Sequence, residues 1–203
     1  MILTPGGEAY ARAAQVLREG GVVAHPTETV YGLAVDPMNL EALAALFAVK
    51  GRPESNPVLL VVSEARQVER YAADIPDVAR RLMEHFWPGP LSLVLPARAG
   101  LPEALTAGGG GVCVRCTGSE IARGICAAFG GAITSTSANR SGEPPAVEVE
   151  AAVLPGVAMG IDGGELGAAL PSTIYDARSG RVLRAGGVTQ AEIWAALSMG
   201  SDA

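Results

Sequence analysis

The sequence predicts an α/β fold, in which helices flank a mostly covered sheet. Short apolar runs with the character of buried strands alternate with amphipathic stretches, without an internal repeat or a break in composition. Apolar residues make up 49% of the chain and charged residues 18%, which is typical of a compact globular protein. Since 203 residues suit one good-sized core, we expect residues 1–203 to form a single domain.

The first half of the chain alternates between the two kinds of element. The expected helices are 8–18, 40–49, 65–73 and 77–85, and the expected strands are 22–24, 33–35, 58–62 and 91–95. Gly20-Gly21 provides a stop for the first helix, and Asn39 is a good N-cap for the second. The continuous apolar run 58–62 is typical of a strand that is covered on both faces.

The second half continues the pattern. The expected strands are 112–116, 132–134, 157–161, 173–175 and 181–184, and the expected helices are 119–129, 148–154 and 190–197. Along the strand 112–116, Cys113 and Cys116 have an odd separation and face opposite sides, which disfavours a shared metal or redox pair. The hydroxyl-rich run 135–139 is expected to leave its strand as a polar loop.

Charge and cysteine content limit the classes of function. With 15 Lys and Arg against 21 Asp and Glu, the net charge is −6, so no general surface for polyanions is expected. Three cysteines do not make an even disulfide framework. The N-terminus lacks the pattern of a signal peptide, and no apolar run approaches the roughly 18 residues of a membrane span. We therefore expect a soluble cytoplasmic protein that makes no membrane contact.

Four polar segments stand at the ends of apolar elements: the turn after Pro26, the loop after Lys50, and residues 135–139 and 171–173. Open α/β sheets place ligand crevices at such ends. Cations suit a polyphosphate, and hydroxyls on small residues allow close approach to its oxygens. No Walker sequence, dinucleotide fingerprint or Gly-x-Ser-x-Gly elbow is present. A structural alternative stays open, in which the turn hydroxyls satisfy the backbone and Lys50 interacts with a helix dipole.

Seven short motifs are spread over the chain. They are Pro26-Thr27-Glu28-Thr29-Val30-Tyr31-Gly32-Leu33, Lys50-Gly51-Arg52-Pro53, Asn56-Pro57, Trp87-Pro88-Gly89-Pro90-Leu91-Ser92, Ser137-Ala138-Asn139 with Ser141-Gly142, Pro171-Ser172-Thr173 and Leu183-Arg184. In this order they resemble the YrdC-like family, the threonylcarbamoyl-AMP synthases, in its short form with one domain.

The resemblance implies a twisted, open, mixed α/β sheet flanked by helices around a deep basic cavity. It implies a nucleotidyltransferase that condenses L-threonine, bicarbonate or carbon dioxide, and ATP to threonylcarbamoyl-AMP and pyrophosphate, normally with Mg²⁺. The product would pass to other proteins that complete the threonylcarbamoylation of an adenosine in tRNA.

The resemblance also implies a role for individual residues. Contacts to ATP fall on Lys50, Arg52, Asn56, Ser137, Asn139 and Arg184, of which Lys50 and Arg52 are also the catalytic candidates. Contacts to threonine fall on Thr27, Thr29, Tyr31, Arg115, Ser135 and Ser172. No residue is assigned to a metal. Arg115, a cation on a strand, suits a bidentate grip on the threonine carboxylate or its carbamate.

The chain differs from many relatives at two positions. Val61 stands where many have a histidine, and Gly111 stands where many have a threonine. We expect the first to remove a polar group from the threonine pocket and the second to remove a hydroxyl near the nucleotide.

Two other functions stay open. One is a carbamoyl-adenylate-forming enzyme with a different acceptor, as in the YrdC-like part of hydrogenase maturation carbamoyltransferases. The other is an RNA-binding or ribosome-assembly module that uses a concave basic surface, and a weak RNA contact is also compatible with the enzyme. The net charge of −6 and the lack of aromatic stacking motifs speak against the module.

Overall fold

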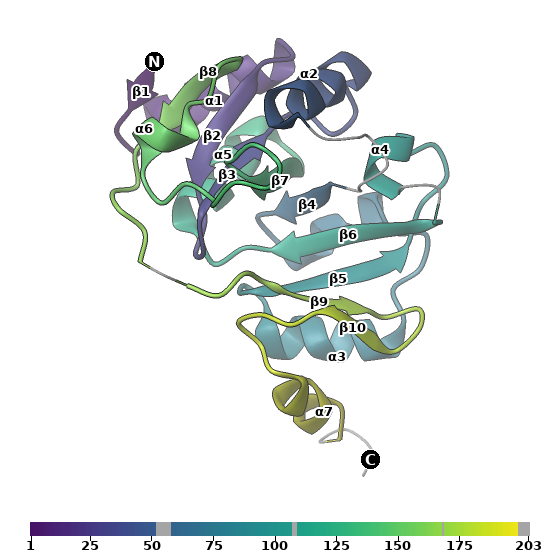
Figure 1. The fold of residues 1–203 in the computed structure, drawn as a ribbon. Coiled ribbons are helices and arrows are strands. Elements are labelled where there is room, and N and C mark those ends of the chain that lie inside the picture. Colours follow the sequence, from purple (N-terminus) through teal and green to yellow (C-terminus); the bar gives the residue numbers. More distant parts are fainter. Residues whose placement is uncertain (52–57, 107–108, 168, 199–203) are drawn as a thin grey trace.

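The computed structural model describes residues 1–51, 58–106, 109–167 and 169–198 (Figure 1). Within these residues, ten strands join one sheet in the order β1-β8-β2-β3-β7-β4-β6-β5-β9-β10. The strands are β1 (Ile2–Leu3), β2 (Val22–Pro26), β3 (Tyr31–Ala34), β4 (Leu59–Val62), β5 (Leu91–Pro96), β6 (Gly111–Cys116), β7 (Ile133–Ser137), β8 (Val157–Ile161), β9 (Thr173–Asp176) and β10 (Arg181–Arg184). The helices are α1 (Gly7–Arg18), α2 (Leu40–Lys50), the 3-10 helix η1 (Ala65–Arg70), α3 (Asp77–Phe86), α4 (Glu103–Thr106), α5 (Glu120–Phe129), α6 (Val149–Ala152) and α7 (Gln190–Ser198).

The sheet is mixed and open. β2 and β3 form an antiparallel hairpin, and β7 lies antiparallel between β3 and β4. β4 pairs in parallel with β6, while β5 runs antiparallel to β6 and parallel to β9. The two edge strands, β1 and β10, lie at opposite ends of the strand order and do not meet. The fold class expected from the sequence, an open mixed sheet flanked by helices, is therefore confirmed.

The alternation of side chains along the strands divides the core into two clusters. On one face, α1 and α5 pack against residues of β2, β3, β4, β7 and β8, among them Val23, Val61 and Ile133. On the other face, the core joins α2, η1, α3, α6 and α7 to residues such as Leu60 and Val114. The first cluster draws no described residue from β5, β6 or β9. The part of the first face that β5, β6 and β9 form is therefore not filled by this cluster and can hold a ligand site.

Most expected helices form close to their expected bounds. Asn39 caps α2 as predicted, since its Oδ1 accepts the backbone N–H groups of Glu41 and Ala42 at 3.0 and 3.1 Å. The helix expected over 65–73 is wrong in type and length, because η1 is a 3-10 helix that ends at Arg70. β1 and α4 were not predicted, because two and four residues are too short to show a period.

No helix in the described residues combines the length and the apolar character needed to cross a membrane.

The hydroxyl-rich run continues the sheet. We expected a loop from Ser135 onward, but β7 extends through Ser137. Ser135 lies opposite Leu59 of β4, and Ser137 lies opposite Gly32 of β3. The loop prediction is therefore wrong for these two serines. Because β7 lies between two strands, its serines stand at fixed positions on the sheet.

Candidate active site

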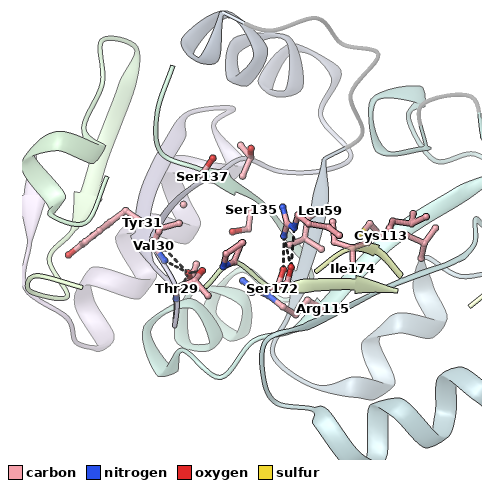
Figure 2. A pocket seen from close by; sticks show the side chains of 17 residues that line it. Thr29, Val30, Tyr31, Leu59, Cys113, Arg115, Ser135, Ser137, Ser172 and Ile174 are labelled. Carbon is pink, nitrogen blue, oxygen red and sulfur yellow. Dashed lines mark hydrogen bonds between the residues drawn. The ribbon is translucent and has the colours of Figure 1, made fainter. Parts of the chain in front are cut away.

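A pocket of about 360 Å³ lies on the same face of the sheet as α1 and α5, in the part that these helices leave uncovered (Figure 2). Its lining residues are Thr27, Thr29, Val30, Tyr31, Gly32, Leu59, Val94, Cys113, Arg115, Ser135, Thr136, Ser137, Pro171, Ser172, Ile174, Leu183 and Arg184. Among the described lining residues, two are cations and none is a carboxylate. The chemistry of the wall is therefore that of two guanidinium groups among hydroxyls and apolar side chains.

Strand register brings these residues together. Ser135 and Ser137 project from the same face of β7, since side chains two residues apart share a face. Leu59 and Gly32 lie beside them on the neighbouring strands. Arg115 projects from the same face of β6, which pairs with β4. Eight of the twelve site residues expected from the sequence line this one pocket: Thr27, Thr29, Tyr31, Arg115, Ser135, Ser137, Ser172 and Arg184.

The turn between β2 and β3 is held by the Thr27 hydroxyl. Its Oγ1 accepts the backbone N–H groups of Thr29 and Val30 at 3.1 and 3.2 Å, and donates to the Val30 carbonyl at 2.6 Å. Thr29 Oγ1 lies 3.0 Å from the same oxygen. Since the proton of Thr27 is already used, Thr29 is the donor in that bond. Thr27 therefore stabilises the turn, and Thr29 keeps lone pairs with which to accept a hydrogen bond from a ligand.

Tyr31 lines the pocket, but its hydroxyl points elsewhere. The phenol donates to the Gly164 carbonyl at 2.9 Å and accepts the Gly163 N–H at 2.8 Å. In Figure 2 the ring extends away from Ser135 and Arg115. Burial raises the pKa of the phenol, so it stays protonated at neutral pH. The hydroxyl of Tyr31 thus anchors the 163–164 segment.

Arg115 is the most deeply buried cation of the pocket wall, with 3% of its side chain exposed. Its Nη1 lies 3.5 Å from Oε1 of Glu28, and its buried Nε has no hydrogen-bond partner among the described residues. Burial lowers the pKa of the guanidinium, which Glu28 opposes, and the group stays protonated because arginine is not deprotonated in proteins. A buried guanidinium with unused donors is a strong candidate to bind an anionic ligand.

Arg184 and Ser172 form one unit. The Arg184 guanidinium donates from Nε and Nη2 to the Ser172 carbonyl at 3.0 and 2.8 Å, and from Nη2 to the Ser172 hydroxyl at 3.0 Å. Ser172 Oγ also lies 2.9 Å from Oγ of the buried Ser92. Nearby, burial raises the pKa of the Cys113 thiol to about 12, so this wall residue is neutral. Two residues assigned to different substrates from the sequence thus depend on each other for position.

Lys50 lies at the end of α2, and 3% of the residue is exposed. Its Nζ donates to the backbone carbonyls of Ser137 and Asn139 and to Oδ1 of Asn139. The Ser137 hydroxyl donates to the same Oδ1 at 2.6 Å. The three residues therefore form a connected network, in which the ammonium orders the end of β7. Arg52 and Asn56, the remaining candidates, lie outside the described residues.

The chain also matches a known family. The Sua5/YciO/YrdC family model, whose description is "Telomere recombination", matches residues 15–186. This match covers most of the chain. The chain belongs to this family.

Known proteins of the Sua5/YciO/YrdC family resemble the chain in sequence and in fold. A threonylcarbamoyl-AMP synthase of Halorhodospira halophila is 45% identical over 182 residues, which cover 85% of this chain and 92% of that protein. The crystal structure of P. abyssi Sua5 complexed with L-threonine matches with a TM-score of 0.92 and 34% identity over 97% of this chain, and this chain spans 61% of that one. E. coli YciO shares the fold, with a TM-score of 0.83 at 24% identity, over 93% of this chain and 96% of that one.

Neither Val61 nor Gly111 is part of the pocket lining. Val61 is fully buried in the cluster beneath α1 and α5, beside Arg115 and Ile133 in the sheet. Val61 itself does not line the pocket, and the effect of a polar side chain at this position stays a prediction. At Gly111, an added Cβ would come within 2.5 Å of the Arg178 guanidinium. That guanidinium occupies the space that a threonine side chain would take.

Sequence reasoning missed three polar residues behind the pocket wall, namely the buried His25 and Ser92 and the half-buried Glu28. His25 is fully buried, and its Nε2 has no hydrogen-bond partner in the described part of the chain. Gly32 lies against it, since a Cβ there would come within 3.2 Å of His25 Nε2 and 2.8 Å of Ser135 Oγ. The presence of Glu28 in the turn motif was the one available signal. Its partner lies on a distant strand, so spacing in the sequence could not reveal the pair.

Proposed function

We propose that this chain is a threonylcarbamoyl-AMP synthase, which condenses L-threonine, bicarbonate or carbon dioxide, and ATP to threonylcarbamoyl-AMP and pyrophosphate. The observation that carries the proposal is the buried guanidinium of Arg115, with unused donors, in a pocket that also presents Thr29, Ser135 and Ser172. A cation among hydroxyls suits a small hydroxylated amino acid with a free carboxylate. Family membership and 45% identity to an enzyme of this name support the same conclusion.

The reaction needs no covalent intermediate with the protein. The threonine amine adds to carbon dioxide and loses a proton, which gives a carbamate. A carbamate oxygen then attacks the α-phosphorus of ATP, and the bond to pyrophosphate breaks. The chain contributes by holding the two reactants in contact and by placing positive charge where negative charge develops. Arg115 binds the threonine carboxylate, and Thr29, Ser135 and Ser172 contact the amino acid.

On the nucleotide side, the proposal assigns the phosphates to Lys50 and Arg52. Asn56, Ser137, Asn139 and Arg184 position the remainder of ATP. The network in which Lys50 binds Ser137 and Asn139 supports a common role for these three residues. Thr27 shapes the threonine pocket by fixing the turn between β2 and β3, and Tyr31 shapes it by anchoring the 163–164 segment. Residues 1–203 act together as one YrdC-like domain.

The described lining residues do not form a magnesium site of the usual kind. Protein ligands for Mg²⁺ are mostly carboxylates, which act together with the phosphates of the substrate. No described lining residue carries a carboxylate, and no group of three or more His, Cys, Asp or Glu among the described residues is arranged to hold a metal.

We further propose that the adenylate product passes to proteins that transfer the threonylcarbamoyl group to tRNA, in the cytoplasm.

The proposal is tested by the dependence of pyrophosphate release on each substrate. Purified protein is incubated with ATP and bicarbonate, with or without L-threonine, and the adenylate is identified by mass spectrometry. L-Threonine is expected to support release about 10-fold or more better than L-serine, since one buried methyl group is worth about this factor. Release that does not depend on threonine would contradict the proposal.

A second arm tests the assigned cation. Arg52→Ala is expected to lower turnover by about 100-fold or more, because a positioned charge at the phosphates acts on the transition state. Arg66→Ala is the matched control, because the side chain of Arg66 is 81% exposed on η1. Circular dichroism establishes that both variants fold. Normal turnover in Arg52→Ala would show that this loop does not hold the phosphates.

A further inference from the structure

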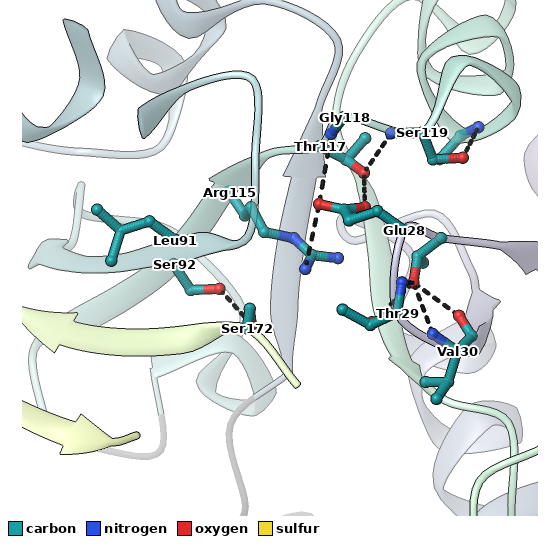
Figure 3. Close-up of polar contacts among 12 residues, drawn as sticks. Glu28, Thr29, Val30, Leu91, Ser92, Arg115, Thr117, Gly118, Ser119 and Ser172 are labelled. Carbon is teal, nitrogen blue, oxygen red and sulfur yellow. Dashed lines mark hydrogen bonds and ion pairs between the residues drawn. The ribbon is translucent and has the colours of Figure 1, made fainter. Parts of the chain in front are cut away.

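Glu28 lies in the turn between β2 and β3 but is not part of the pocket lining. Its carboxylate points toward the segment that follows β6 (Figure 3). The Thr117 hydroxyl donates to Oε2 at 2.6 Å, and the Gly118 N–H donates to Oε1 at 3.3 Å. The same Oε1 lies 3.5 Å from Nη1 of Arg115. Glu28 therefore contacts both the end of β6 and the guanidinium that this strand carries.

Further hydrogen bonds join the turn between β2 and β3 to the segment that follows β6. The Ser119 hydroxyl donates to the Pro26 carbonyl at 2.9 Å and caps α5 by accepting the Ala122 N–H at 3.3 Å. The Ser119 N–H in turn donates to the Thr117 hydroxyl at 3.2 Å. The turn that carries Thr29 and the strand that carries Arg115 are thus tied by side chains distant in sequence. The carboxylate of Glu28 is the charged member of this connection.

Glu28 and Arg115 carry opposite charges at neutral pH. Burial by itself raises the pKa of Glu28, but the charge of Arg115 and the hydrogen bonds from Thr117 and Gly118 outweigh it and bring the pKa below its ordinary value. Glu28 is therefore ionised at neutral pH. It is the one carboxylate paired with Arg115 among the described residues.

The pair leaves most of the guanidinium unused. Arginine has five N–H donors, and Glu28 approaches one of its nitrogens, at a distance of 3.5 Å. Nε of Arg115 is buried with no partner in the described part of the chain. Unmet donors in a buried cation are unfavourable, so a ligand carboxylate that supplies acceptors is strongly favoured there. The carboxylate of Glu28 fixes one side of the guanidinium and leaves its remaining donors to the ligand.

We propose that Glu28 is a positioning residue for substrate recognition, which orients Arg115 so that its free donors bind the carboxylate of the amino-acid substrate. The inference rests on the proposed function, because it assumes an amino acid in this pocket. Glu28 itself does not touch the substrate. Glu28 affects the binding of the substrate carboxylate only through Arg115.

A double-mutant cycle tests this dependence. Glu28→Gln keeps the size of the side chain and its ability to accept from Thr117, but removes the charge that faces Arg115. Binding of L-threonine is measured by calorimetry for the wild type, Glu28→Gln, Arg115→Gln and the double variant. We expect Glu28→Gln alone to weaken binding about 10-fold, and to have less than about a 2-fold effect when Arg115 is already replaced. An equal loss in both backgrounds, or no loss in the first, would overturn the proposal.

A ligand series adds a readout that a purely structural role would not change. L-Threoninamide lacks the negative charge that Arg115 would bind, so Glu28→Gln is expected to change its affinity by less than about 2-fold. In turnover assays, the KM for L-threonine should rise while kcat and the KM for ATP stay within about 2-fold of the wild type. A fall in kcat or a higher KM for ATP without a change for threonine would contradict a positioning role.

Asp176→Asn is the matched control, since Asp176 also pairs with an arginine, Arg178, at 3.0 Å and does not line the pocket. This variant removes a carboxylate from an ion pair elsewhere on the sheet, and its threonine affinity should equal that of the wild type. Calorimetry needs no turnover, so it distinguishes the two ideas. If threonine binds with the expected cycle but no pyrophosphate is released, the proposed reaction fails while the role of Glu28 stands.

Discussion

His25 makes the stability of this protein depend on pH in a predictable direction. Burial lowers the pKa of the imidazole from 6.5 to about 4, with a smaller contribution from Arg115 and opposing ones from the Pro26 carbonyl and Glu28. The folded protein therefore binds the proton less well than the unfolded chain. Below pH 6.5 the unfolded state gains a proton that the folded state does not. Stability is thus fully present above pH 6.5 and is lost as the pH falls toward 4.

The size of the effect follows from the shift. A change from 6.5 to about 4 corresponds to about 3 kcal/mol. Because the loss grows as the pH falls, about 1 kcal/mol of it should appear between pH 7.5 and pH 5.5. His25→Phe removes the titrating group and keeps a ring of similar size. Since Nε2 has no partner and Nδ1 lies 3.4 Å from the Pro26 carbonyl, the variant loses little hydrogen bonding at pH 7.5.

The assay is urea unfolding of wild type and His25→Phe at pH 7.5, 6.5 and 5.5. Subtracting the two free energies of unfolding at each pH cancels the carboxylates that both proteins share. The wild type should lose about 1 kcal/mol more than the variant between the first and last pH. His85→Gln, at the other histidine and on the surface, should follow the wild type. Parallel curves for wild type and His25→Phe would refute the buried, neutral state of His25.

Two further substitutions test the pocket wall. Tyr31→Phe removes the hydroxyl that binds Gly163 and Gly164 and should lower the free energy of unfolding by about 1–2 kcal/mol, while the KM for threonine changes less than about 2-fold. A large rise in that KM would show that the phenol contacts the substrate after all. Gly32→Ala places a methyl group 2.8 Å from Ser135 Oγ, so we expect a loss of about 1–3 kcal/mol in urea unfolding and weaker threonine binding by calorimetry. Unchanged values for both would show that the wall relaxes without strain.

The secondary structure and the candidate residues were largely accessible from the sequence. Asn39 indicated the start of α2, and glycines marked the ends of α1 and α5, because capping depends on residues close in sequence. The hydroxyl run around Ser135 was misread as a loop. Serine and threonine are common in turns, and only the strands on both sides of β7 explain why the run stays extended.

Residue type and local period were enough to predict the α/β class, the order of most elements and the identity of the polar motifs. The contacts of those polar groups became visible in the three-dimensional arrangement alone. It directs the Tyr31 hydroxyl to Gly164, joins Lys50 to Asn139, and pairs Arg115 with Glu28. The physical reason is that hydrogen bonds and ion pairs are selected by strand register between distant parts of the chain. The residue type sets whether a side chain is polar, and the pairing of the strands sets which atoms that side chain contacts.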